Sequence, residues 1–269
     1  TYLMKKILII GKRGFIGNSL SKYLKKFYKV KQISFKDLNK FKSIINNFDY
    51  IVNTSINKNY INYKYKEKFD NDLKISKLIN NQKIFYTFIS TRKVYPSKAN
   101  LKENTKLSPK SNYSKNKLIT EQKLTEKFKD NLIILRVSNI IGDKSLTKKI
   151  HQTFIDVFYE NIEKGIVIDN GKAFKDFLSI DKFCQIFKNI IKKNLSGVYN
   201  VSIGQKVYLN DLIKWLNISN KKKLKKVKIK KKIDSFYLNN RKLMSKIKIS
   251  NSLTDLKQYC YQLSKDKFS

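Results

Sequence analysis

The chain has 269 residues, enough to bury one substantial core without disulfides or metals. Its 59 Lys and Arg against 20 Asp and Glu give a formal net charge of +39, and it has two cysteines, one histidine and no apolar run long enough to cross a membrane. This composition argues against a disulfide-stapled, membrane-spanning or histidine-rich metal protein, and we expect a soluble, cytoplasmic, metal-free one.

The positive charge by itself would favour nucleic acid or anionic lipid as a partner. Lys, Asn and Ile are enriched together along the whole chain, however, as compositional drift would produce. The densest lysine run, residues 221–232, alternates with Leu224, Val227 and Ile229, which is typical of a strand with one wet face. We therefore expect no membrane or nucleic-acid partner, and RNA binding stays as an alternative.

The first half of the chain alternates short apolar strands with helical segments. We predict strands at residues 7–10, 30–34, 50–54, 84–90 and 132–137, and helices at 15–27, 69–81 and 111–128. Such an alternation favours a doubly wound parallel sheet with helices on both faces.

The second half of the chain is less regular. We predict helices at residues 148–161, 181–192 and 209–216, and strands at 166–168 and 198–201. No Pro- or Gly-rich linker separates the two halves, so we expect them to interleave.

A glycine-rich turn follows the first predicted strand. Gly11, Gly14 and Gly17 stand between that strand and a helix. The first glycine allows a tight turn, the second lets the backbone approach a pyrophosphate, and the third lets the helix pack on the strand. Because a helix N-terminus attracts anions, this context predicts a dinucleotide site.

Tyr113 and Lys117 form a candidate acid/base pair. Four residues apart on one helix face, the phenol and the ammonium can lie beside the same cofactor. An ordinary phenol, with a pKa of about 10, is a poor acid/base at neutral pH, and a neighbouring cation stabilises its phenolate. The same spacing recurs at Tyr60 and Tyr261, but Tyr113 follows Thr91, which ends a strand where a doubly wound sheet presents ligands.

These features resemble the extended short-chain dehydrogenase/reductases of the NAD-dependent epimerase/dehydratase type, which act on nucleotide sugars. The motifs that carry the resemblance are Gly11-x-x-Gly14-x-x-Gly17, Ser90-Thr91-x-x-Val94-Tyr95, Tyr113-x-x-x-Lys117, Leu135-Arg136-x-x-Asn139, Lys175-Asp176-Phe177 and Gly197-x-Tyr199-Asn200. The resemblance implies an α/β fold with a Rossmann-type doubly wound parallel sheet and a small interleaved C-terminal substrate lobe. We expect the dinucleotide-binding domain over residues 4–145, with returning segments near 171–203, and the lobe over most of 146–269. A homodimer through the helices around Asn81 and 111–128 is a further expectation.

The resemblance also implies roles for single residues. The catalytic residues would be Thr91, Tyr113 and Lys117. The dinucleotide would be held by Gly11, Arg13, Gly14, Phe15, Ile16, Gly17, Ser34, Asp37, Leu38, Asn53, Tyr113 and Lys117. The substrate would be held by Thr91, Asn139, Lys175 and Arg241, the last two as cations for its diphosphate.

The end of the second strand favours NADP over NAD as the cofactor. NAD-specific members of the family carry an acid there to hold the ribose 2′-hydroxyl, and this chain has Ser34, with Lys36 beyond it. Without that carboxylate a 2′-phosphate meets no repulsion, and Arg13 is placed to pair with it.

The two residues that directly follow Thr91 help to decide which reaction we expect. A 4,6-dehydratase of the family carries an acidic pair directly after the threonine, and this chain has Arg92 and Lys93. We therefore expect a reductase that transfers hydride to a keto group of a nucleotide sugar while Tyr113 protonates the oxygen. A nucleotide-sugar epimerase is the alternative, and a non-catalytic dinucleotide- or RNA-binding basic protein is the alternative from another class.

Overall fold

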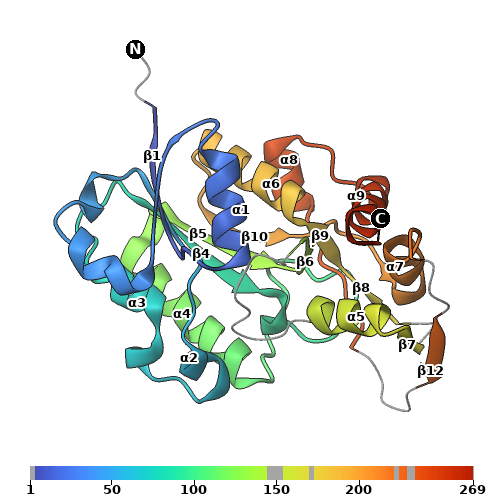
Figure 1. Ribbon diagram of the computed structural model, residues 1–269. Helices are drawn as coiled ribbons and strands as arrows, with labels where there is room; N and C mark the ends of the chain where they lie inside the picture. Colours follow the sequence, from blue (N-terminus) through green and yellow to red (C-terminus); the bar gives the residue numbers. More distant parts are fainter. Residues whose placement is uncertain (1–3, 144–153, 170–172, 221–223, 229–233, 269) are drawn as a thin grey trace.

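The computed structural model describes residues 4–143, 154–169, 173–220, 224–228 and 234–268. Its centre is a six-stranded sheet in the order β10-β5-β4-β3-β1-β2 (Figure 1), in which every neighbouring pair is parallel. The strands are β1 (Lys6–Ile10), β2 (Lys29–Ile33), β3 (Tyr50–Asn53), β4 (Phe85–Thr91), β5 (Leu132–Val137) and β10 (Gly197–Val201). The predicted doubly wound parallel sheet is confirmed, and the direction of winding changes between β1 and β3.

Burial follows the position of each strand in the sheet. In β1 the run Ile7–Ile10 is fully buried, and all residues of β3 and β5 are buried, because helices cover both faces. The edge strand β2 instead contains three polar residues, Lys29, Lys31 and Gln32, and only Ile33 is buried. The continuous apolar runs of the sequence thus correspond to the central strands.

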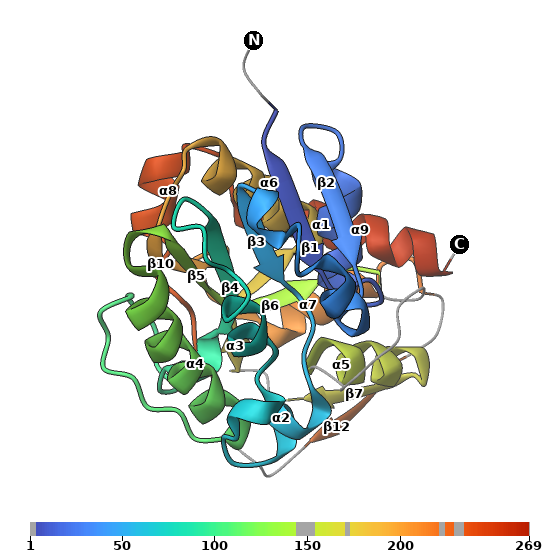
Figure 2. The ribbon, with the colours of Figure 1, turned by 90° about the vertical axis from the view of Figure 1, so that its left-hand side faces the viewer.

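Helices cover the sheet on both sides. One face packs against α1 (Phe15–Leu24), α6 (Ile180–Lys192) and α8 (Arg241–Ile247), and the other against α3 (Asn71–Ser76) and α4 (Asn112–Phe128). The short helix α2 (Lys58–Asn62) packs on α4. Figure 2 looks from the side of α3 and α4, with α2 at the bottom. Each face buries its own core, one centred on Ile7 and Phe183 and the other on Leu8 and Tyr86.

A second group of elements gathers beyond the carboxyl ends of the strands, at the right of Figure 1. It contains the helices α5 (Phe154–Glu163), α7 (Leu209–Leu216) and α9 (Leu253–Phe268). It also contains three two-stranded sheets, in which β6 (Asn139–Ile141) pairs with β9 (Phe177–Ser179), β8 (Phe174–Lys175) with β11 (Val207–Tyr208), and β7 (Ile166–Asp169) with β12 (Lys225–Lys228). The chain leaves the main sheet after β5 and returns to it for α6 and β10, so the two parts interleave as expected.

The structure departs from the sequence prediction in several places. The helix expected at residues 69–81 is only α3, because the chain turns after Ser76 and the backbone amides of Asn80 and Asn81 donate to the side chain of Asn46. Between β2 and β3 the structure agrees with the prediction, since no helix was expected there and residues 35–41 and 45–47 form 3-10 turns. The start of the helix expected at 148–161, the histidine at 151 and most of the lysine run 221–232 lie outside the described residues.

The last helix, α9, was not predicted from the sequence. Its apolar residues Leu253, Leu256, Cys260 and Leu263 recur at helical spacing and pack on α7 and the core of the second group. Like every other helix in the described part of the chain, it lacks the length and apolarity needed to cross a membrane.

Candidate active site

The glycine-rich turn joins β1 to α1 at the carboxyl edge of the sheet. Gly11 has φ +134°, and a Cβ on it would lie 2.1 Å from Thr54 Oγ1. A Cβ on Gly17 would lie 2.3 Å from the carbonyl oxygen of Gly11, whereas one on Gly14 would meet nothing nearer than the Thr54 carbonyl oxygen at 3.8 Å. Gly11 and Gly17 are therefore required for packing, and Gly14 leaves the start of α1 open to an anion such as a pyrophosphate.

The residues that flank this turn differ in their accessibility. Arg13 is exposed, and Phe15 and Ile16 are half-buried against the core. The Phe15 ring lies beside Gly142, where an added Cβ would be 2.4 Å from it, so α1 packs closely on the loop after β6.

The end of β2 lacks a carboxylate at the position after Ile33. The side chain of Ser34 instead begins a 3-10 turn and accepts a hydrogen bond from the Lys36 amide at 3.4 Å. The Asp37 carboxylate pairs with the Lys40 ammonium at 3.5 Å, and Leu38 is buried in the core.

Asn53 and Asn71 brace the chain after β3. Asn53 Oδ1 accepts from the amide and the hydroxyl of Ser55 at 2.9 and 2.6 Å. Asn71 Nδ2 donates to the same hydroxyl at 3.0 Å. Asn53, which was predicted to contact the cofactor, and Asn71 thus shape one turn at the carboxyl edge.

Tyr113 and Lys117 lie on the first turns of α4, which begins with a capping box between Ser111 and Ser114. Lys117 is buried, and its Nζ donates to the Ile89 carbonyl of β4 at 2.8 Å and lies 4.4 Å from the Phe88 ring centroid. The ammonium is also 6.0 Å from the ring centroid of Tyr113, which is half-buried. The structure therefore brings the predicted pair together at the sheet.

Thr91 ends β4 beside this pair. It is 9% exposed, and its Oγ1 accepts from the Lys93 amide at 3.3 Å. The Lys93 side chain turns toward α4 and places Nζ 5.9 Å from the Tyr113 ring centroid. The Tyr113 ring is thus flanked by two ammonium groups, those of Lys93 and Lys117.

A buried polar network supports α4 behind the site. Arg136 of β5 donates to both carboxylate oxygens of Glu121, with the shortest contact at 2.7 Å, and to the Tyr95 hydroxyl at 2.9 Å. Tyr95 in turn donates to Asn200 Oδ1 at 2.8 Å. Glu121 was not predicted as a site residue, although it lies eight residues after Tyr113 on the same helix face, which is the signal that could have found it.

Three cations gather at the end of β4. Arg92 pairs with the Asp234 carboxylate and lies 3.8 Å above the Phe236 ring, and Lys175 Nζ donates to the Asp234 carbonyl at 2.6 Å. Burial lowers the pKa of Arg92 to about 10. Burial, together with the charges of Arg92 and Lys93, lowers the pKa of Lys175 to about 7.

The remaining predicted substrate residues lie apart from this group. Asn139 Nδ2 donates to the Asp176 carbonyl at 3.0 Å and joins β6 to β9. Arg241 is exposed at the start of α8, and within the described residues its guanidinium makes no contact with Thr91, Tyr113 or Lys117. Asp234 and Phe236 were missed, because their sequence segment carries no motif and meets Arg92 only through the fold.

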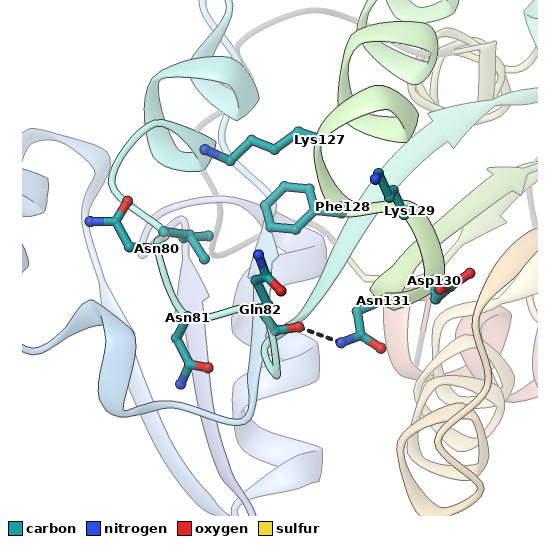
Figure 3. A pocket seen from close by; sticks show the side chains of 9 residues that line it. Asn80, Asn81, Gln82, Lys127, Phe128, Lys129, Asp130 and Asn131 are labelled. Atoms are coloured by element: carbon teal, nitrogen blue, oxygen red, sulfur yellow. Dashed lines mark hydrogen bonds between the residues drawn. The ribbon is translucent and has the colours of Figure 1, made fainter.

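A surface cavity of about 230 Å³ lies at the other end of α4, between residues 79–82 and 127–131 (Figure 3). Asn131 Nδ2 donates to the Gln82 carbonyl across it at 2.6 Å. These segments precede β4 and β5, so the cavity is at the amino edge of the sheet. Because doubly wound sheets bind ligands at the carboxyl edge, this cavity is not the candidate active site.

The parallel sheet and the glycine-rich turn at the end of β1 define a Rossmann-type dinucleotide-binding fold. The model of the "NAD dependent epimerase/dehydratase family" matches residues 7–202. The chain therefore belongs to this family, and the resemblance seen in the sequence is confirmed.

Relatives within the family differ in the reactions that their names state. A dTDP-D-glucose 4,6-dehydratase of Dictyostelium discoideum is 29% identical to this chain, and the match covers 80% of this chain and 62% of that protein. The chain thus spans less than two thirds of the length of this relative.

Solved structures of 16–19% identity share the fold. A UDP-N-acetylglucosamine 4-epimerase from Methanobrevibacter ruminantium M1, in complex with UDP-N-acetylmuramic acid, is 19% identical with a TM-score of 0.79 and 97% of each chain covered. A dTDP-4-dehydrorhamnose reductase from Clostridium acetobutylicum is 17% identical with a TM-score of 0.75, and the match covers 96% of this chain and 99% of that one. RMD from Pseudomonas aeruginosa, complexed with NADPH, is 16% identical with a TM-score of 0.75, and the match covers 98% and 97%.

Proposed function

We propose that this protein is an NADP-dependent reductase of a keto group on a nucleotide sugar. The dinucleotide supplies the hydride when it is bound. Tyr113 gives a proton to the oxygen of the keto group, Thr91 orients that oxygen, and Lys117 stabilises the phenolate that remains. The observation that carries this proposal is the placement of Tyr113 and Lys117 beside the end of β4, with Lys117 held by the Ile89 carbonyl.

The choice of NADP rests on the charges around the adenosine end of the expected cofactor. Ser34 occupies the end of β2, where a carboxylate would repel a 2′-phosphate, and Arg13 is exposed beside the glycine-rich turn. The nearby carboxylate of Asp37 is paired with Lys40. These features favour a phosphorylated ribose.

Dehydration is disfavoured although one relative is named as a 4,6-dehydratase. That reaction needs an acid to protonate the departing hydroxyl, and a base to take the proton from the neighbouring carbon. Arg92 and Lys93 follow Thr91 directly, and the guanidinium of Arg92 is committed to Asp234. Two cations cannot take the place of two carboxylates.

An epimerase is the second candidate, favoured by the shared fold of the UDP-N-acetylglucosamine 4-epimerase. Tyr113 would take the proton of a sugar hydroxyl and Thr91 would orient its oxygen, while the hydride on the same carbon passes to bound NAD. The same hydride and proton would then return to the ketone, the hydride from its other face. In either case Asn139, Lys175 and Arg241 are the proposed substrate contacts.

The proposal includes a cytoplasmic homodimer and no catalytic metal. Cys184 and Cys260 are free and buried, and burial raises the pKa of each thiol to about 12, which suits a reducing compartment. A non-catalytic basic protein remains the alternative from another class.

Cofactor stoichiometry separates these candidates. The purified protein is incubated with NADPH or NADH and a panel of UDP- and dTDP-linked keto sugars, and dinucleotide oxidation is followed at the nicotinamide absorbance. In parallel it is incubated with NAD and the corresponding hydroxy sugars, and the sugar products are separated and identified. A reductase consumes one NADPH per product, an epimerase interconverts nucleotide sugars without net consumption, and a non-catalytic protein does neither. The proposal fails if the wild type turns over no nucleotide sugar, or if Tyr113→Phe is as active as the wild type.

A further inference from the structure

Three basic side chains gather at the end of β4, and the proposed function does not explain why they lie together. Arg92 and Lys93 belong to the turn directly after Thr91, and Lys175 comes from β8. Asp234 joins two of them, because its carboxylate pairs with Arg92 and lies 4.0 Å from Lys175 Nζ. We call Arg92, Lys93 and Lys175 the cation cluster.

Repulsion within the cation cluster favours an anion. Beyond the effect of burial, Arg92 lowers the pKa of Lys93, and both Arg92 and Lys93 lower the pKa of Lys175. Three cations in partly buried positions raise one another's free energy, and a carboxylate brought among them relieves that repulsion.

Lys93 is the member of the cation cluster that faces the reaction. Its ammonium is 5.9 Å from the Tyr113 ring centroid, and it forms no ion pair with any carboxylate of the described residues. Arg92, in contrast, is fixed by Asp234 and by the Phe236 ring. Lys93 is therefore the member of the cation cluster that lies nearest to the Tyr113 ring in the described contacts, while Arg92 and Lys175 both contact Asp234.

We propose that the nucleotide sugar bound here carries a carboxylate on its sugar ring, next to the reacting carbon, and that Lys93 binds this carboxylate with support from Arg92 and Lys175. This inference rests on the proposed function. The diphosphate is the other anion of such a substrate, but it is bonded to the anomeric carbon, whereas Tyr113 acts on a different carbon of the ring. A cation directly after Thr91 and over the Tyr113 ring is therefore better placed for a group on the sugar.

Binding of three unreactive ligands to the NADPH-loaded protein tests the inference. UDP-glucuronate, UDP-glucose and UDP are titrated calorimetrically at fixed ionic strength into the wild type, Lys93→Gln and Lys115→Gln. The two sugars differ only in a carboxylate against a hydroxymethyl group. Lys115 lies on α4 close to Tyr113 but is exposed, so its variant controls for loss of one positive charge from a basic surface.

The wild type should bind UDP-glucuronate about tenfold more tightly than UDP-glucose, as expected for one charge-assisted hydrogen bond. Lys93→Gln should bring that ratio close to unity while NADPH and UDP affinities stay unchanged, and Lys115→Gln should preserve the ratio. Equal binding of the two sugars by the wild type overturns the inference and leaves the proposed function standing. An equal loss for all three ligands in Lys93→Gln also overturns it, because Lys93 then binds the diphosphate. If NADPH binds but no UDP ligand does, the proposed function itself fails.

Discussion

Lys117 has a fixed position, whereas the Tyr113 ring beside it is only half-buried. The Lys117 ammonium is held by the Ile89 carbonyl at 2.8 Å and packs on the Phe88 ring, both on β4. Because the Lys117 ammonium is held by the sheet, it can stabilise the Tyr113 phenolate on the same helix and keep its position when substrate binds. The proposed chemistry therefore depends on Tyr113.

Tyr113→Phe should lower kcat by about two to four orders of magnitude, because the substrate oxygen loses its proton donor. NADPH affinity should change little, since only the hydroxyl is removed. Steady-state kinetics and a separate NADPH titration measure the two effects. Tyr261→Phe, in the same Tyr-x-x-x-Lys spacing on α9, is the matched control and should keep full activity. Equal loss in both variants would contradict the assignment.

The glycines of the turn after β1 should respond differently to a methyl group. Gly17→Ala places a Cβ 2.3 Å from the Gly11 carbonyl and should lower the free energy of unfolding by about 1–3 kcal/mol through overpacking. Gly14→Ala meets nothing nearer than 3.8 Å, and its φ of −90° suits alanine, so stability should be nearly unchanged. Urea denaturation of both variants measures this difference. A lower stability of Gly14→Ala would show that other atoms lie closer to the Gly14 Cα than the structure places them.

At the scale of elements, the sequence predicted those strands and helices whose local residue pattern favours the structure that the fold also requires. β1, β3 and β5 are buried on both faces and are continuous apolar runs in the sequence. The predicted helix over residues 111–128 corresponds to α4, whose N-cap is Ser111. The helix that carries both Tyr113 and Lys117 was also predicted, because its spacing was visible in the sequence, whereas the hydrogen bond from Lys117 to Ile89 of β4 was not predicted.

Other parts of the site could not be predicted, because they depend on segments that are distant in the chain. Asp234 meets Arg92 only because Leu238 bridges to Leu101 and Phe236 packs on Val94. Asp176 accepts the amides of Ile203 and Leu238 and so holds that segment in place. Such contacts have no local signal, so the cation cluster became visible only in the structure.

The Glu121–Arg136 ion pair joins α4 to β5 and is almost fully buried, with side-chain exposures of 5% and 7%. Glu121→Gln would leave the Arg136 guanidinium without its counter-charge and should lower the free energy of unfolding by about 3–5 kcal/mol. Glu126→Gln, exposed on the same helix, should change stability by less than about 0.5 kcal/mol. Chemical denaturation compares the two, and similar stabilities would contradict a structural role for the pair.

Asp72 of α3 gives the fold a pH dependence. Burial raises the pKa of its carboxyl to about 7, against the opposing effects of Lys117 and of the hydrogen bond from Tyr86. A raised pKa means that the folded state binds the proton more tightly, so this contribution to stability is complete below pH of about 4 and is lost as pH rises toward 7.

Asp72→Asn should therefore flatten the change in unfolding free energy between acid and neutral pH relative to the wild type, because the amide does not titrate. Denaturation at a series of pH values measures this slope, with the exposed Asp130→Asn as control. An unchanged slope in Asp72→Asn would mean that Asp72 stays ionised in the folded protein.

At the scale of the whole molecule, the site depends on the interleaving of the two parts. The main sheet supplies Thr91, its covering helix α4 supplies Tyr113 and Lys117, and the chain beyond β5 supplies Lys175 and the segment that carries Asp234. With a formal net charge of +39, the protein surface binds any anion weakly and non-specifically. Measurements at low and high salt distinguish such binding from binding to a specific pocket, because salt screens exposed charges more strongly.

The most direct test of the account is a titration of NADPH and NADH into the wild type and Gly14→Asp at low and high salt. The account predicts one saturable site in the wild type that persists at high salt, prefers NADPH, and is lost in Gly14→Asp, where a carboxylate would face the pyrophosphate at the start of α1. Binding that disappears with salt in both proteins would contradict it, and the protein would then be a basic scaffold without a dinucleotide site.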